Sequence, residues 1–207
     1  MRRDAKPAFA LAVLFLFMGA SPVMAIEEAS YTVERKQGRF ELRDYAPQTV
    51  AETVVDGCLE DAGNRAFNRL FRYIAGDNQS RAQIAMTAPV GQERSGEKIA
   101  MTAPVLQEGL DSRWTVSFMM PASYSLETLP EPDDASVALR AIPARRMAAI
   151  RYRGFWSEKN YRRNLVALET WIKEQGVEPV GTPVWARYNP PFTPWFLRRN
   201  EILIPVE

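Results

Sequence analysis

The stretch FELRDYAPQTVAETVV at residues 40–55 decides the fold, because it holds two strand-like segments joined by one proline step. Residues 40–45 begin by alternating apolar and polar side chains, and residues 49–55 are rich in the β-branched residues that strands favour. Ala46-Pro47 separates them, and proline interrupts a strand because it has no backbone N–H. The pattern predicts two strands joined as a hairpin at this step.

The same plan returns later in the chain, where residues 137–142 lead through Pro143-Ala144 into residues 147–152. A helical pattern follows each pair of strands, at about 62–75 and about 157–175. More strands are expected after each helix, at 83–90, 97–106 and 113–119 in the first half and at 182–188 and 200–206 in the second. A hairpin, a helix and strands that occur twice indicate an internal duplication.

The first half also contains the sequence IAMTAPV twice, as Ile84–Val90 and as Ile99–Val105. The residues between the copies are polar and include glycine, so the two copies are expected to form the antiparallel arms of a long hairpin. Core packing explains the Ile, Met and Val, with each proline placed where its missing N–H costs no ladder bond. A repeated Met-Thr-Ala-Pro is more than a core requires, so a functional role stays open.

Each predicted helix has one apolar face that would pack on a sheet. Ser157 is placed to cap the second helix and Gly176 to end it. The apolar faces consist of Phe67, Leu70, Phe71 and Ile74 in the first helix and Tyr161, Leu165, Leu168 and Ile172 in the second. The connector at 129–134 is too short to separate two domains. We therefore expect one α+β domain, a curved or distorted barrel-like antiparallel sheet made of two pseudo-repeats, with two main helices packed on it.

The first 25 residues have the form of a signal peptide and are set apart from the fold. A basic start at Arg2, Arg3 and Lys6 precedes an apolar run at 8–19 that is short for a membrane span, and small residues suit cleavage after Ala25. We expect an exported single domain at 26–207, periplasmic or secreted, without stable membrane insertion after cleavage. An uncleaved anchor is the alternative.

Composition excludes several classes of function. The chain carries a formal net charge of +1 and is nearly neutral without its leader, whereas nucleic-acid binding requires a clustered positive excess. It contains no histidine, which excludes Ser-His-Asp and Cys-His catalysis and imidazole ligation of a metal. Cys58 is the single cysteine, so no internal disulfide can form.

Four motifs together resemble the SOUL family of haem-binding proteins, here as a bacterial, exported member. They are the repeated Met-Thr-Ala-Pro-Val, the Pro-Ala-Arg-Arg turn at 143–146, Tyr188-Asn189-Pro190-Pro191, and Arg198-Arg199-Asn200-Glu201. The likeness runs from about Tyr31 to Val206. It implies a distorted barrel of two β-α-β repeats, similar also to the effector-binding modules of bacterial drug-sensing regulators. It further implies a carrier or buffer of tetrapyrroles rather than an enzyme.

The resemblance also places a site at the first helix, around Arg65 to Tyr73, and at the loop 190–196. Some members of the family ligate the haem iron through histidine, which this chain lacks. In others an apolar surface of this helix, here including Phe71, holds the macrocycle, and basic groups reach the propionates. Arg65, Arg69 and Arg72 fall at i, i+4 and i+7 and form one stripe that suits carboxylates. An ordinary solvated face, with Asp61 and Arg65 as a weak pair, is the alternative.

The proline-rich loop contributes Phe192, Trp195 and Phe196, whose rings can stack on a conjugated macrocycle. Packing that seals the end of the barrel is the other explanation for them. If iron is ligated, the available groups are Met86, Met101, Tyr73 and Cys58, all of which also have a structural explanation. No metal ligand is assigned.

The sequence thus predicts a protein that binds haem or another porphyrin by an apolar wall and basic groups, without histidine ligation. Haem is expected as a ligand and not as a catalytic cofactor. Two alternatives stay open. One is a general binding module for amphipathic aromatic ligands or hydrophobic cations, and the other is a hydrolase that uses Glu201 and a tyrosine.

Overall fold

A computed structural model describes residues 26–80, 96–110 and 112–207 of this chain. The predicted leader at 1–25, the strand at 83–90 and the first IAMTAPV copy lie outside the described residues. The helices are α1 (Leu59–Ala75), α2 (Glu158–Glu174) and the short 3₁₀ helix η1 (Trp195–Leu197). The strands are β1 (Tyr31–Gln37), β2 (Phe40–Tyr45), β3 (Gln48–Asp56), β4 (Asn78–Gln79), β5 (Val105–Leu110), β6 (Arg113–Met119), β7 (Glu131–Pro132), β8 (Val137–Ile142), β9 (Arg145–Arg153), β10 (Val184–Arg187) and β11 (Arg199–Pro205).

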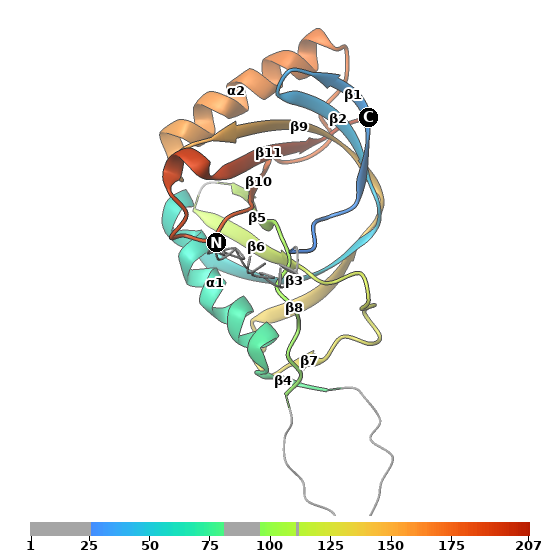
Figure 1. Ribbon diagram of the computed structural model, residues 1–207, viewed down its shortest axis with the longest axis vertical. Helices are drawn as coiled ribbons and strands as arrows, with labels where there is room; N and C mark the ends of the chain where they lie inside the picture. Colours follow the sequence, from blue (N-terminus) through green and yellow to red (C-terminus); the bar gives the residue numbers. More distant parts are fainter. Residues whose placement is uncertain (1–25, 81–95, 111) are drawn as a thin grey trace, which may run out of the picture.

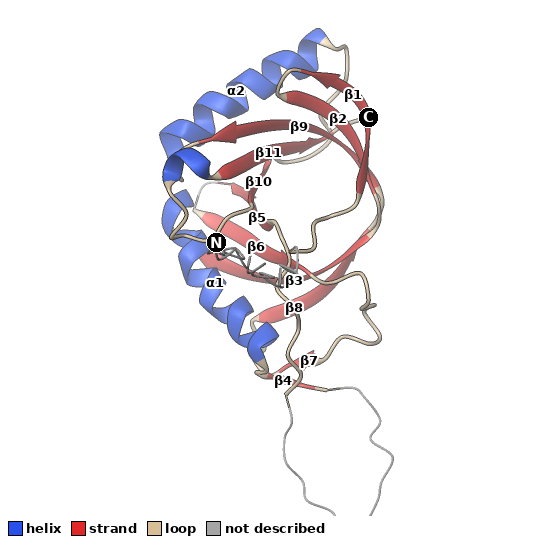
Figure 2. Cartoon of the chain, viewed as in Figure 1, coloured by secondary structure: helices blue, strands red, loops and turns tan. Residues whose placement is uncertain are grey.

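Nine of these strands form one strongly curled antiparallel sheet in the order β1-β2-β9-β11-β10-β5-β6-β3-β8 (Figure 1). Figure 2 shows that both long helices lie outside the curl, with α1 over β3 and β6 and α2 over β9 and β11. The predicted fold class, an α+β domain with a curved sheet and two packed helices, is confirmed.

The expected hairpins are wrong in their pairing. β2 does not pair with β3, because β2 pairs with β9 and β3 pairs with β8. Tyr45 at the end of β2 lies opposite Arg145 of β9, and Gln48 at the start of β3 lies opposite Ile142 of β8. The two-residue steps Ala46-Pro47 and Pro143-Ala144 therefore face each other and interrupt the pairing at the same position. The two proline steps therefore bend two long paired strands together instead of folding each strand back on itself.

The expected strand at 97–106 is also corrected, because strand geometry begins only at Val105. Upstream of it, the backbone N–H of Glu97 donates to Asn78 Oδ1 at 2.9 Å and the N–H of Ile99 donates to the Ile74 carbonyl at 2.8 Å. The N–H of Ala103 donates to Glu27 at 2.9 Å. These bonds bind the segment to the end of α1 and to the N-terminal segment, so it has no ladder partner in the described sheet.

The helices follow the sequence prediction closely. Ser157 caps α2 by accepting a hydrogen bond from the N–H of Asn160 at 3.3 Å, and Gly176, with φ +67°, follows the end of the helix. α1 begins at Leu59, three residues before the predicted start, and Cys58 precedes it without a side-chain cap. Among the described residues, neither long helix has the length and apolarity that a bilayer crossing requires.

The core lies between the helices and the outer face of the sheet, where Leu70, Ile150 and Ile202 are fully buried. The concave inner face carries a second apolar cluster around Met147 and Leu203. Next to that cluster the inner face buries three charged residues, Glu41, Arg43 and Glu201, and Arg43 pairs with both carboxylates.

Both carboxylate oxygens of Glu201 accept hydrogen bonds from neighbouring side chains. Arg43 Nη1 donates to Oε2 at 2.6 Å and the Tyr188 hydroxyl donates to the same oxygen at 3.1 Å. Arg151 Nε and Arg199 Nε each donate to Oε1 at 3.0 Å. Burial raises the pKa of Glu201, but the hydrogen bonds and charges of these arginines outweigh it and keep that pKa below its ordinary value. The carboxylate is therefore ionised and fully engaged.

We predict that Arg43→Met lowers the free energy of unfolding by about 3–5 kcal/mol, because it removes one partner of a buried ion pair. Arg162→Met is the control, since it removes an exposed pair with Glu158 and should cost less than about 1 kcal/mol. Urea unfolding followed by circular dichroism measures both. Equal small losses in the two variants would show that the inner cluster contributes no stability.

Candidate ligand-binding site

A groove of about 680 Å³ lies on the outer side of the molecule, between α1 and the segment after β10. Its lining comes from α1, from the residues around Met101 before β5, and from the loop 189–192. The side chains that line it are mainly apolar and include Phe67, Phe71, Met101, Trp156, Pro190, Pro191 and Phe192. Its volume lies within the range of about 300–1,000 Å³ that is typical of small-molecule sites.

The aromatic wall on α1 has a fixed geometry. Phe67 and Phe71 are one helical turn apart and stack with ring centroids 5.8 Å apart and planes 12° apart. Phe67 also packs edge-on against Phe118 of the sheet at 5.3 Å, which holds it in place. Phe71 and Phe192 remain exposed at 46% and 85%, so both rings offer apolar faces to a ligand.

Arg187, the last residue of β10, supplies the charge in this groove. Its side chain is 7% exposed, and its Nε has no hydrogen-bond partner. Within the described residues its guanidinium forms no ion pair, and it lies 5.1 Å from the Trp156 ring and 5.2 Å from the Trp185 ring. Burial lowers the pKa of Arg187 to about 10, so the group is charged at neutral pH.

Gly63 of α1 provides the space for this guanidinium. A Cβ on Gly63 would lie 1.8 Å from Arg187 Nη2, so no larger residue fits without moving the arginine. Glycine inside a helix is unfavourable by about 1 kcal/mol relative to alanine. The close approach of Arg187 is the physical reason for its presence here.

Only some of the residues that the sequence suggested for the site line the groove. Phe71 and Phe192 line the groove, whereas the arginine stripe does not. Arg65 lies over Gly57, where a Cβ would be 2.3 Å from its Nη2. Arg69 Nη1 donates to Thr53 Oγ1 at 3.5 Å, and Arg72 lies 3.5 Å from Asp134.

Trp195 and Phe196 also lie outside the groove lining. Trp195 stacks on Phe155 with ring centroids 4.8 Å apart, and Phe196 meets Trp195 edge-on at 5.6 Å. The proline-rich loop thus divides its aromatic residues between the groove and a separate exposed cluster.

Of the groups considered for iron, Met101 is the one that lines the groove. The Tyr73 hydroxyl is buried and donates to the Pro130 carbonyl at 2.9 Å, and Cys58 donates to Asp61 at 3.2 Å at the start of α1. Met86 lies outside the described residues. In the parts of the chain that the structure describes, no cluster of three or more Cys, Asp or Glu side chains suits a metal ion.

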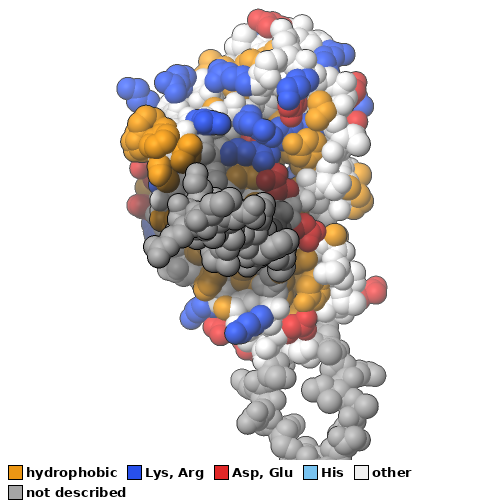
Figure 3. Space-filling model, in the orientation of Figure 1, with side chains coloured by type: hydrophobic (Ala, Val, Ile, Leu, Met, Phe, Trp, Pro, Cys, Tyr) orange, Lys and Arg blue, Asp and Glu red, His pale blue; other side chains and the backbone are white. Residues whose placement is uncertain are grey.

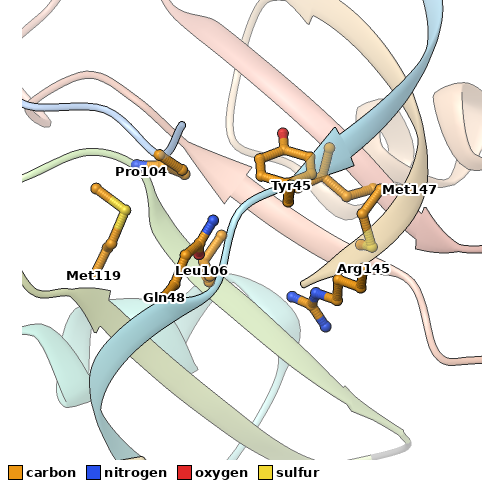
Figure 4. A pocket seen from close by; sticks show the side chains of 9 residues that line it. Tyr45, Gln48, Pro104, Leu106, Met119, Arg145 and Met147 are labelled. Carbon is orange, nitrogen blue, oxygen red and sulfur yellow. The ribbon is translucent and has the colours of Figure 1, made fainter. Parts of the chain in front are cut away.

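The inner face carries two hollows. One is open and measures about 560 Å³, and its lining is mainly charged and polar, with Glu52, Glu108, Arg113 and Arg140 among its residues. The other is the small cavity in Figure 4, with Tyr45 and Met147 on one side and Pro104 and Met119 on the other. Its volume of about 10 Å³ is that of a single water site. The outer groove is the stronger candidate for an apolar organic ligand, because its lining is mainly apolar whereas that of the open inner hollow is mainly charged and polar.

Sequence reasoning missed Arg187. A signal was present, since β10 alternates as VWAR and places Arg187 on the same face as the fully buried Trp185. Whether a carboxylate meets such an arginine depends on neighbouring strands and on α1, which the local sequence does not reveal.

Comparison with known proteins agrees with this architecture. The family model described as SOUL heme-binding protein matches residues 26–205. Heme-binding protein 1 of Xenopus tropicalis is 25% identical over 164 residues, which cover 79% of this chain and 81% of that protein.

Two solved structures share the fold at low identity. The C-terminal domain of EcmrR superposes with a TM-score of 0.58 at 12% identity, covering 86% of this chain and 98% of that one. A hydrolase from Listeria innocua gives a TM-score of 0.55 at 13% identity, covering 84% and 94%. At such identity these likenesses concern the fold alone.

We predict that Gly63→Ala lowers the free energy of unfolding of the wild-type protein, because the new methyl group displaces the buried Arg187 guanidinium. In an Arg187→Ala background the same change should instead stabilise by about 1 kcal/mol, the ordinary helical preference for alanine. Urea unfolding of the four proteins measures this coupling. Identical effects of Gly63→Ala in both backgrounds would contradict the contact.

Proposed function

Because this chain belongs to the SOUL heme-binding protein family, we propose that it is a carrier or buffer that binds haem or a related tetrapyrrole in the groove between α1 and the loop 189–192. The observation that supports this most is one combination: a largely apolar groove of about 680 Å³ that contains a buried arginine with an unpaired Nε. A flat conjugated ligand with a carboxylate at its edge matches both features.

The apolar part of the groove suits the ring. Phe71 on α1 and Phe192 on the loop both line the groove, and both leave a large fraction of their surface exposed. Stacking on a conjugated macrocycle would bury these rings, and each well-buried aromatic side chain contributes about 1.5–3 kcal/mol. The proline-rich loop presents Phe192 with little conformational freedom to lose.

Arg187 suits the carboxylate. A buried arginine without a counter-ion is unfavourable, and a ligand carboxylate beside the guanidinium would supply the opposite charge. We therefore assign propionate recognition to Arg187. Arg65, Arg69 and Arg72 would contribute mainly through their charge, because they lie on a flank of α1 that does not line the groove.

The chain has no histidine, so this proposal requires none. When haem is bound, its iron would add Lewis-acid and redox chemistry, and Met101 is the thioether that the groove could offer it. Our proposal relies on apolar contact and on Arg187 instead, and it extends to metal-free porphyrins.

The two alternative functions have less support. A module for hydrophobic cations, or a hydrolase that uses Glu201, would need a free carboxylate beside a cavity. Glu201 is engaged by Arg43, Arg151, Arg199 and Tyr188, and the cavity next to it measures about 10 Å³. Two other carboxylates, Glu52 and Glu108, line the open inner hollow of about 560 Å³, but Arg140 pairs with Glu52 and the Thr182 hydroxyl donates to Glu108. We infer a binding role and not a catalytic one.

We predict that haemin and metal-free protoporphyrin bind the wild-type protein within about tenfold of each other, a difference of about 1.4 kcal/mol. Arg187→Gln should weaken both at least about tenfold, because it removes a charge-assisted hydrogen bond from a buried site. Arg65→Glu with Arg72→Glu is the matched charge control and should have a smaller effect that added salt abolishes. Fluorescence and absorbance titrations measure all three proteins.

A chemical control separates the carboxylate from the ring. Protoporphyrin dimethyl ester lacks the ionised propionates, so it should bind wild type and Arg187→Gln equally. A haemin preference above about a hundredfold that survives Arg187→Gln would refute the proposal in favour of iron ligation. Circular dichroism confirms that each variant is folded.

A further inference from the structure

Four apolar side chains form an exposed cluster outside the groove, which we call the aromatic patch: Phe155, Trp195, Phe196 and Leu197. They are 57%, 48%, 53% and 53% exposed. Figure 3 shows hydrophobic side chains gathered at one corner of the molecule, with Lys and Arg side chains beside them. Grouped apolar exposure of this kind is costly in water and marks an interaction surface.

The patch is held in place by its own backbone and is not a mobile tail. Arg198 Nε donates to the Thr193 carbonyl at 2.7 Å and its Nη2 donates to the Pro191 carbonyl at 2.6 Å. The same guanidinium lies 4.3 Å from the Trp156 ring. These contacts fix η1 and the loop before it, so Trp195 and Phe196 point outward while Trp195 stacks on Phe155.

The surroundings of the patch are predominantly basic. Arg153 directly precedes Gly154-Phe155, and the first turns of α2 carry the exposed Lys159, Arg162 and Arg163. The acidic groups there are Glu158, which pairs with Arg162 at 2.6 Å, and Glu60, which accepts the N–H of Glu158 at 3.0 Å. Arg153 and Lys159 form no ion pair with the described residues, so the area keeps a positive excess.

We propose that the aromatic patch docks this protein onto the surface of an anionic lipid bilayer. Trp and Phe side chains favour the boundary between headgroups and acyl chains, and basic residues beside them are attracted to anionic headgroups. We choose an anionic bilayer as the partner because the basic residues beside the patch are complementary in charge to anionic headgroups. The docking is peripheral and does not depend on what the groove binds.

The position of Phe192 connects this surface to the groove. Phe192 lines the groove, is 85% exposed, and precedes Trp195 in the same proline-rich loop. Docking through the patch would therefore bring one wall of the groove close to the lipid, where a poorly soluble ligand could pass between the bilayer and the protein.

Tryptophan fluorescence offers a direct test, because Trp195 is the exposed tryptophan among five and residues 1–25 contain none. Vesicles of brominated phosphatidylglycerol should quench the ligand-free protein, and vesicles of brominated phosphatidylcholine should quench it much less. Trp195→Phe should abolish most of the quenching while sedimentation with the vesicles persists. Quenching that is unchanged in Trp195→Phe would overturn the proposal.

Matched variants test the apolar and the basic side chains separately. Phe155→Ser with Phe196→Ser should reduce the quenching of Trp195, whereas Val166→Ser, an equally exposed apolar site on α2, should not. Arg153→Glu with Lys159→Glu should weaken binding to the anionic vesicles at least about tenfold, and Lys98→Glu with Lys173→Glu should weaken it less.

A second copy of this chain is the competing occupant. Ligand-free wild type that sediments as a dimer, becomes a monomer in Phe155→Ser with Phe196→Ser, and shows no quenching by either vesicle would overturn membrane docking. A porphyrin titration on the same variants separates this result from the proposed function, because the patch residues do not line the groove.

Discussion

The rest of this structure depends on one constraint, the pairing of two long strands that bend at the same level. β2 and β3 run antiparallel to β9 and β8, and Ala46-Pro47 and Pro143-Ala144 interrupt both strands between matching registers. Proline removes a ladder donor from each strand at that level, so the pair can turn a corner there without losing register on either side. The bend curls the sheet, and one long helix packs on each half of it, α1 on β3 and β6 and α2 on β9 and β11.

The curl separates two faces with different chemistry. The inner face is largely charged and polar, because Arg43 and other arginines surround the buried Glu201 and because Glu52, Glu108 and Arg140 line its open hollow. The outer face is covered by α1 and α2, and the loop after β10 leaves the groove open beside α1. An organic ligand is therefore expected outside the curl, at a place where aromatic rings and Arg187 are already in position.

The sequence predicted the features that depend on neighbouring residues in the chain. It did not predict those that depend on which strands and helices pack together. The helices, the Ser157 cap and the duplication follow from periodicity, and the structure has them within a few residues. Periodicity could not distinguish a hairpin from two bent strands paired across the duplication, because both leave the same alternation in the chain. It also showed that Arg65, Arg69 and Arg72 share a face of α1 without showing which element that face meets. Arg187 escaped notice because a missing counter-ion is a property of the folded chain.

A crystal structure of the protein with metal-free protoporphyrin would test the central claim most directly. We expect the macrocycle between Phe71 and Phe192, with one propionate oxygen within hydrogen-bond distance of the Arg187 guanidinium. A macrocycle bound over Arg65, Arg69 and Arg72, or on the inner face beside Glu201, with Arg187 still unpaired, would contradict the account.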